Sequence, residues 1–509
     1  MTSPIMPSPA PSLAGGVTAR TFTGAPMAVI DIGSNSIRLV IYISQGRYPF
    51  PLFNERSNCR LGEGLGPDGI LRKDRVEVAL ATLSRFAGLM QSMGVIKAFP
   101  VATAAVRRAR NAAEFTGPAE AILGHKIMVL SQQEEAHYVS RGITLNVPDM
   151  SGLVADLGGG SLEVVAISKG VVKHSVSFDF GHLSEIEEAE IDAAFSTTPW
   201  MKIDHPGRLY GVGGSFRALG SAYIEQSGYP LAVLHGLNIP AATAGHMLSA
   251  FTRDLPDMTG VPVGRQQNMP CAARIIKCLL RHSAVEKIFI SGTSIRDGVL
   301  AETQFNDAEK ADFLQAVCSE ISHASHRFAN VPRSLFNLLR PLHKVDEERA
   351  LIDADAEQQK FERLLYAACM LSDLCWNEHE DIRGDLGARR VLGLPVNCIT
   401  HKERIWLATV IYHRYVGRKM NKSRPPELGF ILGRNRRAEA TTIGLGLRFA
   451  LMFSGGTSSC LEYLRMTNDG NVLTLQVADA GRRLLDDHSR RRFAQLAQSA
   501  SLVPVIEGD

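Results

Sequence analysis

The chain lacks several short motifs that would define a common enzyme class. It contains no Gly-Lys-Ser or Gly-Lys-Thr sequence, which excludes a P-loop NTPase. It has no Gly-x-Ser-x-Gly sequence, which disfavours a serine hydrolase with a nucleophile elbow. Its 8 cysteines are scattered singly with no Cys-x-x-Cys pair, so neither a zinc site nor a disulfide framework is indicated. We expect reduced thiols and a cytoplasmic protein.

Long apolar runs and a strong net charge are also missing. No stretch approaches the ~20 apolar residues that a transmembrane helix needs, so no transmembrane segment is predicted. The net charge is only +3 over 509 residues, which does not indicate nucleic acid as a partner. With 45% hydrophobic and 21% charged residues, the composition is that of a globular protein with room for two to four domains.

The first 26 residues are rich in Pro, Ser, Ala, Gly and Thr. They lack a basic start followed by an apolar core, so they do not resemble a secretion signal. We predict a disordered leader over residues 1–26, or a folded part whose true start is Met27.

Two glycine-rich acidic turns stand out in the remainder of the chain. They are residues 31–36, Asp-Ile-Gly-Ser-Asn-Ser, and residues 156–161, Asp-Leu-Gly-Gly-Gly-Ser. Each follows a short apolar run and precedes an alternating apolar segment, which predicts a strand, a tight turn and a second strand. Such turns can point several backbone N–H groups at a phosphate, and the Asp at each mouth can hold a cation. A third glycine turn occupies residues 210–215.

This order of turns resembles the actin, hexokinase and sugar-kinase superfamily, and four segments resemble one branch more closely. That branch is the exopolyphosphatase and guanosine pentaphosphate phosphohydrolase family. The segments are residues 31–38, 102–107, 130–136 and 156–163, and residues 292–298 look like the end of its second domain. Gln132 stands where the family usually has Gly. The resemblance is strong over roughly residues 25–305 and thin afterwards.

The resemblance implies an α/β fold with two ribonuclease-H-like (actin-like ATPase) half-domains around a cleft. We place half-domain I at residues 27–148 and half-domain II at residues 149–306. A mainly helical, HD-like region follows at 307–509, with helices expected near residues 313–328, 359–376, 403–415 and 438–452 and a late strand at 472–477 in a small α/β appendage. Ser372 and Asp373 stand where a His-Asp pair would be expected, so we predict no metal site in that region.

Carried over residue by residue, the resemblance makes Glu135 the catalytic carboxylate that orients and deprotonates water. The alternative for the Glu134–Glu135 pair is capping of a helix N-terminus. Asp156 and Glu163, assisted by Asp31, would hold Mg²⁺, and stimulation by K⁺ stays open.

Phosphate binding is expected from both loops and from two arginines. The loop residues would act through backbone N–H and side-chain groups: Gly33, Ser34, Asn35, Ser36, Gly158, Gly159, Gly160 and Ser161. Arg38 and Arg107 can neutralise phosphate bidentately, although each could instead form a structural ion pair.

The leading functional hypothesis is an exopolyphosphatase that removes terminal phosphate from inorganic polyphosphate. The alternatives are a pppGpp 5′-phosphohydrolase and a non-catalytic sensor of ppGpp or pppGpp. A sugar-kinase-like phosphotransferase is disfavoured by the segment around Glu135. Residues 401–437 carry ten Lys or Arg against two Glu, either a solvated face or a track for long polyphosphate. The family resemblance also implies a homodimer, and two half-domains around a cleft predict hinge closure.

Overall fold

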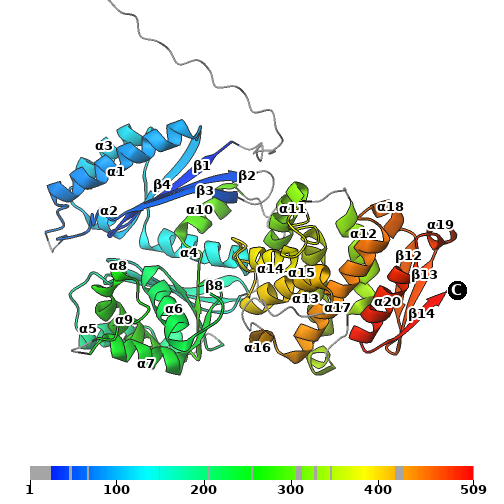
Figure 1. Ribbon diagram of the computed structural model, residues 1–509. Helices are drawn as coiled ribbons and strands as arrows, with labels where there is room; N and C mark the ends of the chain where they lie inside the picture. The colour runs from blue at the N-terminus through cyan, green and yellow to red at the C-terminus, as the bar shows by residue number, and fades with distance from the viewer. Residues whose placement is uncertain are drawn as a thin grey trace, which may run out of the picture.

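The computed structural model describes residues 25–44, 49–65, 68–147, 150–202, 206–253, 256–304, 312–325, 330–343, 347–418 and 429–507 (Figure 1). Two sheets and their helices form the N-terminal part, and a mainly helical region forms the C-terminal part. No helix within these ranges is long and apolar enough to cross a membrane.

The first sheet has five strands in the order β3-β2-β1-β4-β5. β1 pairs antiparallel with β2 and parallel with β4. The strands are β1 (Met27–Ile32), β2 (Ile37–Ser44), β3 (Pro49–Ser57), β4 (Lys97–Ala102) and β5 (Met128–Val129). Helices α1 (Lys73–Ser92) and α3 (Ala112–Leu123) cover one face, burying Leu83, Phe86 and Phe115 with the strands. The short helix α2 (Ala104–Arg108) follows β4 directly.

The second sheet repeats this plan with six strands in the order β10-β11-β9-β6-β7-β8. β6 pairs antiparallel with β7 and parallel with β9, as β1 does with β2 and β4. The strands are β6 (Gly152–Leu157), β7 (Leu162–Ser168), β8 (Val171–Phe178), β9 (Arg208–Val212), β10 (Asn238–Pro240) and β11 (Lys287–Ile290). Its helices are α5 (Glu188–Ser196), α6 (Gly214–Ser227), α7 (Ala241–Phe251), α8 (Val263–Gln266) and α9 (Met269–His282). The repeated hairpin explains why the two glycine turns occur at equivalent places.

Helices α4 (Gln132–Asn146) and α10 (Ile295–Gln304) pack together between the two sheets (Figure 1). One buried cluster joins both sheets to these helices, with Val29 and Val101 from the first sheet and Val154 and Val165 from the second. The helices approach so closely that a Cβ at Gly298 would lie 1.8 Å from the Tyr138 carbonyl oxygen. The close contact between α4 and α10 therefore holds both sheets against one shared layer of helices.

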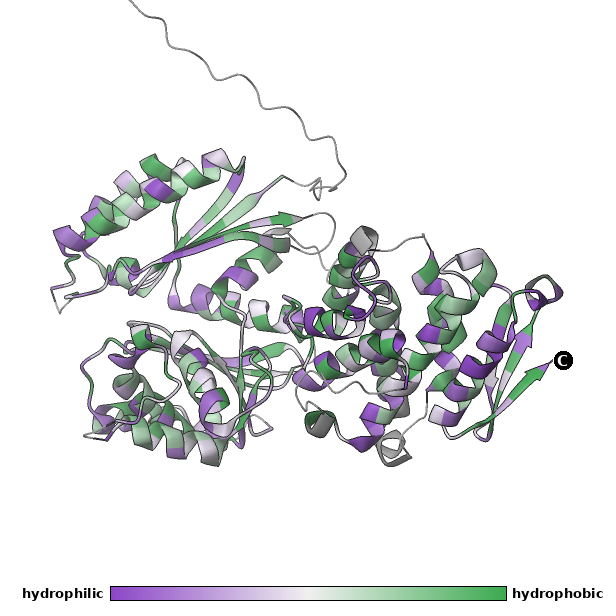
Figure 2. Ribbon diagram, viewed as in Figure 1, coloured by the Kyte–Doolittle hydropathy of each residue, from purple (hydrophilic) through white to green (hydrophobic). Residues whose placement is uncertain are grey.

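The C-terminal region is helical, with a small three-stranded sheet in the order β12-β13-β14 at its far end (Figure 1). Its helices are α11 (Phe313–Ser325), α12 (Val331–Leu339), α13 (Glu347–Met370), α14 (Arg383–Leu392), α15 (His401–Val416), α16 (Gly429–Leu432), α17 (Arg434–Phe453), α18 (Ser458–Leu461), α19 (Asp479–Arg482) and α20 (Asp487–Ser499). The strands are β12 (Leu464–Asn468), β13 (Val472–Val477) and β14 (Val503–Glu507). Hydrophilic and hydrophobic positions both occur along α1 and α20, as expected for helices with one buried face (Figure 2).

These elements confirm the predicted fold class. The expected late strand is β13, and the helix expected to end near residue 376 ends at Met370. The leader up to residue 24 and the boundaries at 148/149 and 306/307 fall outside the described residues, as does part of the basic stretch, residues 419–428.

The place where an HD-type His-Asp pair was expected holds an ion pair. Asp373 is 2% exposed and lies 3.2 Å from Nη2 of Arg414, whose Nε also donates to the Ser372 carbonyl at 2.7 Å. The Arg414 guanidinium thus occupies the position next to the Asp373 carboxylate.

Candidate active site

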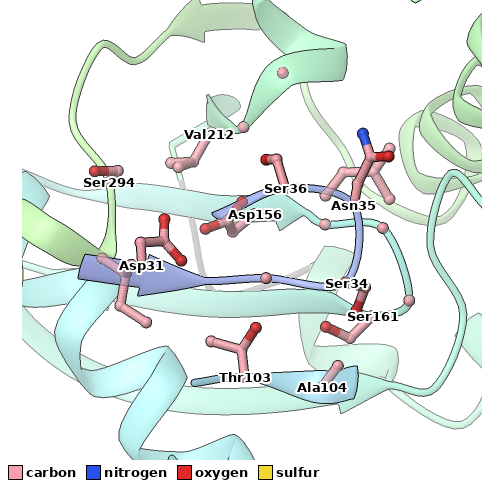
Figure 3. A pocket seen from close by; sticks show the side chains of 18 of the residues that line it. Asp31, Ser34, Asn35, Ser36, Thr103, Ala104, Asp156, Ser161, Val212 and Ser294 are labelled. Carbon is pink, nitrogen blue, oxygen red and sulfur yellow. The ribbon is translucent and has the colours of Figure 1, made fainter. Parts of the chain in front are cut away.

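The two glycine turns line one pocket between the half-domains. Each turn is closed by a backbone bond, from Gly33 N to Ser36 O at 3.1 Å and from Gly158 N to Ser161 O at 3.0 Å. Ser34 of the first loop and Ser161 of the second lie close together (Figure 3). A Cβ added at Gly159 would lie 3.2 Å from the Ser34 Cβ, so the loops touch.

This pocket, of about 160 Å³, collects nearly all the predicted site residues. Its lining includes Glu135 and the three candidate metal ligands. It also includes the loop residues and one of the two predicted arginines: Gly33, Ser34, Asn35, Ser36, Arg38, Gly158, Gly159, Gly160 and Ser161. Asp31 and Asp156, at the ends of β1 and β6, face the same space (Figure 3).

Glu135 reaches the pocket because its neighbour caps the helix. Glu134 N donates to Ser131 Oγ at 3.2 Å, and Ser131 N donates to a Glu134 carboxylate oxygen at 2.8 Å. This capping box fixes the start of α4 and turns Glu135 inward, where it is 8% exposed. The capping alternative therefore describes Glu134, while Glu135 is available for chemistry.

Arg107 lies behind Glu135 and is absent from the pocket lining. Its Nη1 donates to Glu135 Oε2 at 2.6 Å and to the Leu130 carbonyl at 2.9 Å. This is the ion-pair alternative for Arg107. A guanidinium held in this way can orient the Glu135 carboxylate, and phosphate binding by Arg107 stays a prediction.

The buried carboxylates raise one another's pKa. Burial, together with the charges of Glu135 and Asp31, raises the pKa of Asp156 to about 7. Burial and the charges of Glu135 and Asp156 raise the pKa of Glu163 well above its usual value, although Ser177 Oγ donates to its carboxylate at 3.2 Å. Burial also raises the pKa of Glu135, against the opposing effect of Arg107. Crowded carboxylates of this kind favour a bound cation.

The carboxylates of this pocket fit Mg²⁺ if the protein supplies only part of the metal's coordination shell. Oxygens of Asp31, Asp156 and Glu163 do not form a group within 4.8 Å of one another among the described residues. Arg296 Nη1 donates to Asp31 Oδ2 at 2.8 Å, which uses part of that carboxylate. Mg²⁺ commonly takes one or two carboxylates and fills its octahedron with water and phosphate oxygens, which Asp156 and Glu163 can accommodate.

The one group of potential ligands that does meet this distance is Glu188, Asp192 and Cys278, within the described part of the chain. Arg281 donates to all three side chains. We therefore regard that group as an ion-pair cluster of half-domain II.

Sequence reasoning missed most of the arginines. Besides Arg38, the pocket is lined by Arg56, Arg217, Arg265 and Arg296. Only Arg296 forms an ion pair with a described carboxylate, Asp31. Burial and neighbouring guanidinium groups lower the pKa of Arg38 to about 10, and the pKa values of Arg56 and Arg217 are lowered for the same reasons.

Two of these arginines have local signals in the sequence. Arg217 follows the third glycine turn, and Arg296 lies in the segment 292–298 that resembles the family. Arg56 and Arg265 have none. Arg56 pairs across strands with Arg38, and Arg265 lies over Gly214, where a Cβ would approach its Nη2 to 2.2 Å.

His182 is another pocket residue without a sequence signal. It is 5% exposed, and its backbone N–H donates to the Gly158 carbonyl at 3.1 Å, which braces the second loop. Burial and the charge of Arg265 lower its pKa to about 4, so its ring is neutral at physiological pH.

Comparison with known proteins gives two family matches. Residues 39–306 match the Ppx/GppA phosphatase family, and residues 350–503 match the C-terminal exopolyphosphatase family. A guanosine-5′-triphosphate,3′-diphosphate pyrophosphatase from Pseudoalteromonas atlantica is 24% identical over 411 residues, covering 76% of this chain and 79% of that protein. Its namesake from Pseudoalteromonas translucida is 27% identical over 292 residues, 54% of this chain and 58% of that protein.

Solved structures also align with about half of the chain. An exopolyphosphatase from Cytophaga hutchinsonii has 23% identity and a TM-score of 0.49, covering 54% of this chain and 96% of that chain. The Ppx/GppA family member from Aquifex aeolicus has 24% identity and a TM-score of 0.47, with the same coverage. Since the first family match alone spans more than half of the residues, this chain belongs to the Ppx/GppA phosphatase family.

Proposed function

We propose that this protein hydrolyses the terminal phosphoanhydride bond of inorganic polyphosphate and releases orthophosphate, with Mg²⁺ as cofactor. One observation carries the proposal. Four arginines that have no described carboxylate partner face the two glycine loops in one pocket: Arg38, Arg56, Arg217 and Arg265.

Several guanidinium groups that share one pocket without counter-ions repel one another in the free protein. A single phosphate would neutralise only part of this charge, whereas a chain of adjoining phosphates supplies one acceptor group after another. Because the arginines come from β2, β3, α6 and α8, they line the pocket from several elements instead of gathering at one position. This arrangement supports a linear polyanion as the ligand.

The reaction requires water to attack the terminal phosphorus in line with the bridging oxygen. Glu135 accepts the proton of that water as the new P–O bond forms, and the bond to the bridging oxygen breaks. The electron pair of that bond stays on the shortened chain, whose charge the arginines stabilise. Arg107 holds the Glu135 carboxylate in place throughout. When bound at Asp156 and Glu163, Mg²⁺ supplies neutralisation of the phosphoryl oxygens.

The second candidate is 5′-phosphate removal from pppGpp. It uses the same terminal anhydride and the same pocket residues, and the two relatives from Pseudoalteromonas carry names of that activity. Turnover of the two substrates side by side separates the candidates. A homodimer and a cytoplasmic location complete the proposal, the latter supported by eight cysteines that are all free.

The arginine cluster provides the test. We expect Arg217→Gln and Arg265→Gln each to raise KM for polyphosphate about tenfold or more, since each removes a charge-assisted contact. Arg85→Gln is the matched control, because Arg85 pairs with Glu55 on the surface. Steady-state phosphate release gives the answer, and unchanged KM in both pocket variants would contradict the proposed binding mode.

A further inference from the structure

A turn at residues 181–184, shortly after β8, holds two carbonyls of the second glycine loop. The His182 N–H donates to the Gly158 carbonyl at 3.1 Å, and the Leu183 N–H donates to the Gly159 carbonyl at 2.9 Å. A Cβ on the first residue of the turn, a glycine, would lie 2.5 Å from both of these carbonyl oxygens. The turn and the loop are therefore in direct backbone contact, and a side chain at that position would push them apart.

The turn is itself fixed by hydrogen bonds. Gly181 N donates to Ser184 Oγ at 2.9 Å, and Ser184 N donates to the Gly181 carbonyl at 3.0 Å. The Cys271 thiol on α9 donates to the Gly181 carbonyl at 3.6 Å and to the Ser184 carbonyl at 3.3 Å. The turn thus connects the second glycine loop to a long helix of half-domain II.

These contacts determine where the amides of the second loop point. In a trans peptide group the C=O and the following N–H point in opposite directions. Since the carbonyls of Gly158 and Gly159 face the turn, the N–H groups of Gly159 and Gly160 face away from it, and all three glycines line the pocket. Neither N–H donates to a backbone carbonyl of the described residues. Two successive amide donors are therefore available to an anion in the pocket.

The first glycine loop is held in a similar way by a turn that follows β3. Arg60 N donates to the Asn35 carbonyl at 3.0 Å, and Gly62 N donates to the Ser34 carbonyl at 2.8 Å. By the same geometry the N–H groups of Asn35 and Ser36 point away from this turn. No residue of this first turn lines the pocket, so only the turn in half-domain II also contributes a side chain there.

That side chain is the imidazole of His182, which is 5% exposed and lines the pocket. Burial and the charges of Arg265 and Arg56 lower its pKa to about 4, against the effect of the Gly158 and Leu157 carbonyls. Neither ring nitrogen makes a hydrogen bond with a described residue. Buried polar groups almost always have a partner, and a guanidinium cannot be an acceptor. The unpartnered ring beside two arginines therefore indicates a missing anionic ligand.

We propose that His182 binds the phosphate chain directly, and that the turn at residues 181–184 positions the amides of the second glycine loop for the same ligand. The inference rests on the proposed function for the identity of the ligand. It adds a contact residue and a positioning turn to the site: the imidazole N–H donates to one phosphate oxygen, and the N–H groups of Gly159 and Gly160 donate to others.

Binding without turnover tests the contact by His182. Isothermal titration of the full-length protein with Mg²⁺ and the imido analogue of tripolyphosphate would compare the wild type with His182→Asn, His182→Gln and His182→Phe. Asn places an amide N–H near the position of Nδ1 and Gln near that of Nε2, whereas Phe keeps a ring without a donor. We expect His182→Phe to bind about tenfold or more weakly and at least one amide variant to stay within about threefold of the wild type.

A ring that only packs would give the opposite order, with His182→Phe close to the wild type and both amide variants weaker. That order, or an equal loss in all three variants, would overturn the proposed contact. His379→Phe is the matched control, because the His379 side chain is 71% exposed.

Gly181→Ala tests the turn, because its Cβ would displace the second glycine loop. We expect about tenfold weaker binding of the analogue, and about twofold to threefold weaker binding in Cys271→Ala, which removes only the thiol contacts. Gly88→Ala in α1 is the control, since nothing lies within 4 Å of a Cβ built there. Wild-type affinity in Gly181→Ala or, where that variant does not fold, in Cys271→Ala would overturn the positioning role.

The two proposals can fail separately. Analogue binding that depends on His182, without phosphate release from any substrate, would refute the proposed hydrolysis and retain this inference. Hydrolysis by the wild type, with unchanged analogue binding in His182→Phe, would do the reverse.

Discussion

At the residue scale, two groups of like charges occupy one pocket. Burial and mutual repulsion raise the pKa of Asp156 to about 7 and raise that of Glu163, while they lower the pKa of Arg38 and Arg265 to about 10. Both shifts mean that the ligand-free pocket disfavours its charged forms. A cation relieves the carboxylates and a polyanion relieves the arginines, so the pocket favours both together.

The Asp156 carboxylate should lower the free energy of unfolding at neutral and higher pH when Mg²⁺ is absent. Its pKa is about 7 in the folded protein against 3.8 ordinarily, so the folded state binds more protons between these values. Stability therefore falls as pH rises through that window and stays low above it. We expect Asp156→Asn to be more stable by about 1–3 kcal/mol at pH 8 in EDTA and to gain nothing at pH 4. Thermal unfolding measures this, and an equal or lower Tm at pH 8 would contradict it.

The same shift predicts how Mg²⁺ dependence varies with pH. Protons and Mg²⁺ compete for Asp156 and Glu163, so the Mg²⁺ concentration that gives half-maximal phosphate release should fall as pH rises through about 7. Mg²⁺ titrations of activity between roughly pH 6 and 8.5 would show it. A half-saturating concentration that does not vary with pH would argue that these carboxylates do not hold the metal.

The sequence predicted the residues whose role depends on local context. Asp31, Asp156 and the glycines belong to turns that a strand-turn-strand pattern defines. Glu135 was predicted from the resemblance of residues 130–136 to the family. Arg56 and Arg265 could not be predicted, because each reaches the pocket only through pairing of β3 with β2 or packing of α8 against α6. The ion pair between Arg107 and Glu135 could likewise not be predicted, because tertiary packing brings the two residues together.

At the element scale, the crossing of α4 and α10 positions the chemistry. α4 carries Glu135 in its first turn, and α10 carries Arg296 in its first turn. Both helices pack against each other between the sheets. Sequence periodicity predicted four helices of the C-terminal region, which correspond to α11, α13, α15 and α17. The crossing of α4 and α10 is a long-range contact that local patterns do not encode.

A methyl group at the crossing should disturb both stability and activity. A Cβ at Gly298 would lie 1.8 Å from the Tyr138 carbonyl oxygen, so Gly298→Ala must move one helix. We expect a loss of about 1–3 kcal/mol or more in the free energy of unfolding, with lower kcat. Denaturant unfolding and phosphate release would measure the two effects.

Gly245→Ala on α7 is the matched control for that substitution. Nothing lies within 4 Å of a Cβ built at Gly245, and the position is inside a helix. It should gain about 0.4–1 kcal/mol through a less flexible unfolded chain. If Gly298→Ala behaved like this control, the crossing would not be the rigid element that we describe.

At the scale of the whole molecule, the C-terminal region is joined to half-domain II by buried polar contacts. His401 Nδ1 lies 2.9 Å from the Tyr229 hydroxyl, and His401 Nε2 lies 3.0 Å from the His235 carbonyl oxygen. Burial lowers the pKa of His401 to about 4, so the neutral ring donates to the carbonyl and accepts from the phenol.

Two half-domains that meet across a charged pocket should close on a phosphate chain. We expect the radius of gyration to decrease when a non-hydrolysable polyphosphate analogue and Mg²⁺ are added. Small-angle scattering with and without the analogue would detect this. Identical dimensions in both states would mean that the pocket is already closed and that substrate enters without hinge motion.

The central claim is that Glu135 activates water for attack on a terminal phosphoanhydride. The most direct test measures Mg²⁺-dependent phosphate release from long-chain polyphosphate and from pppGpp for the wild type and Glu135→Gln. We predict release by the wild type and a kcat lowered by about 10²–10⁴-fold in the variant, with KM little changed. Release at wild-type rates by Glu135→Gln, or none from either substrate by the wild type, would contradict it.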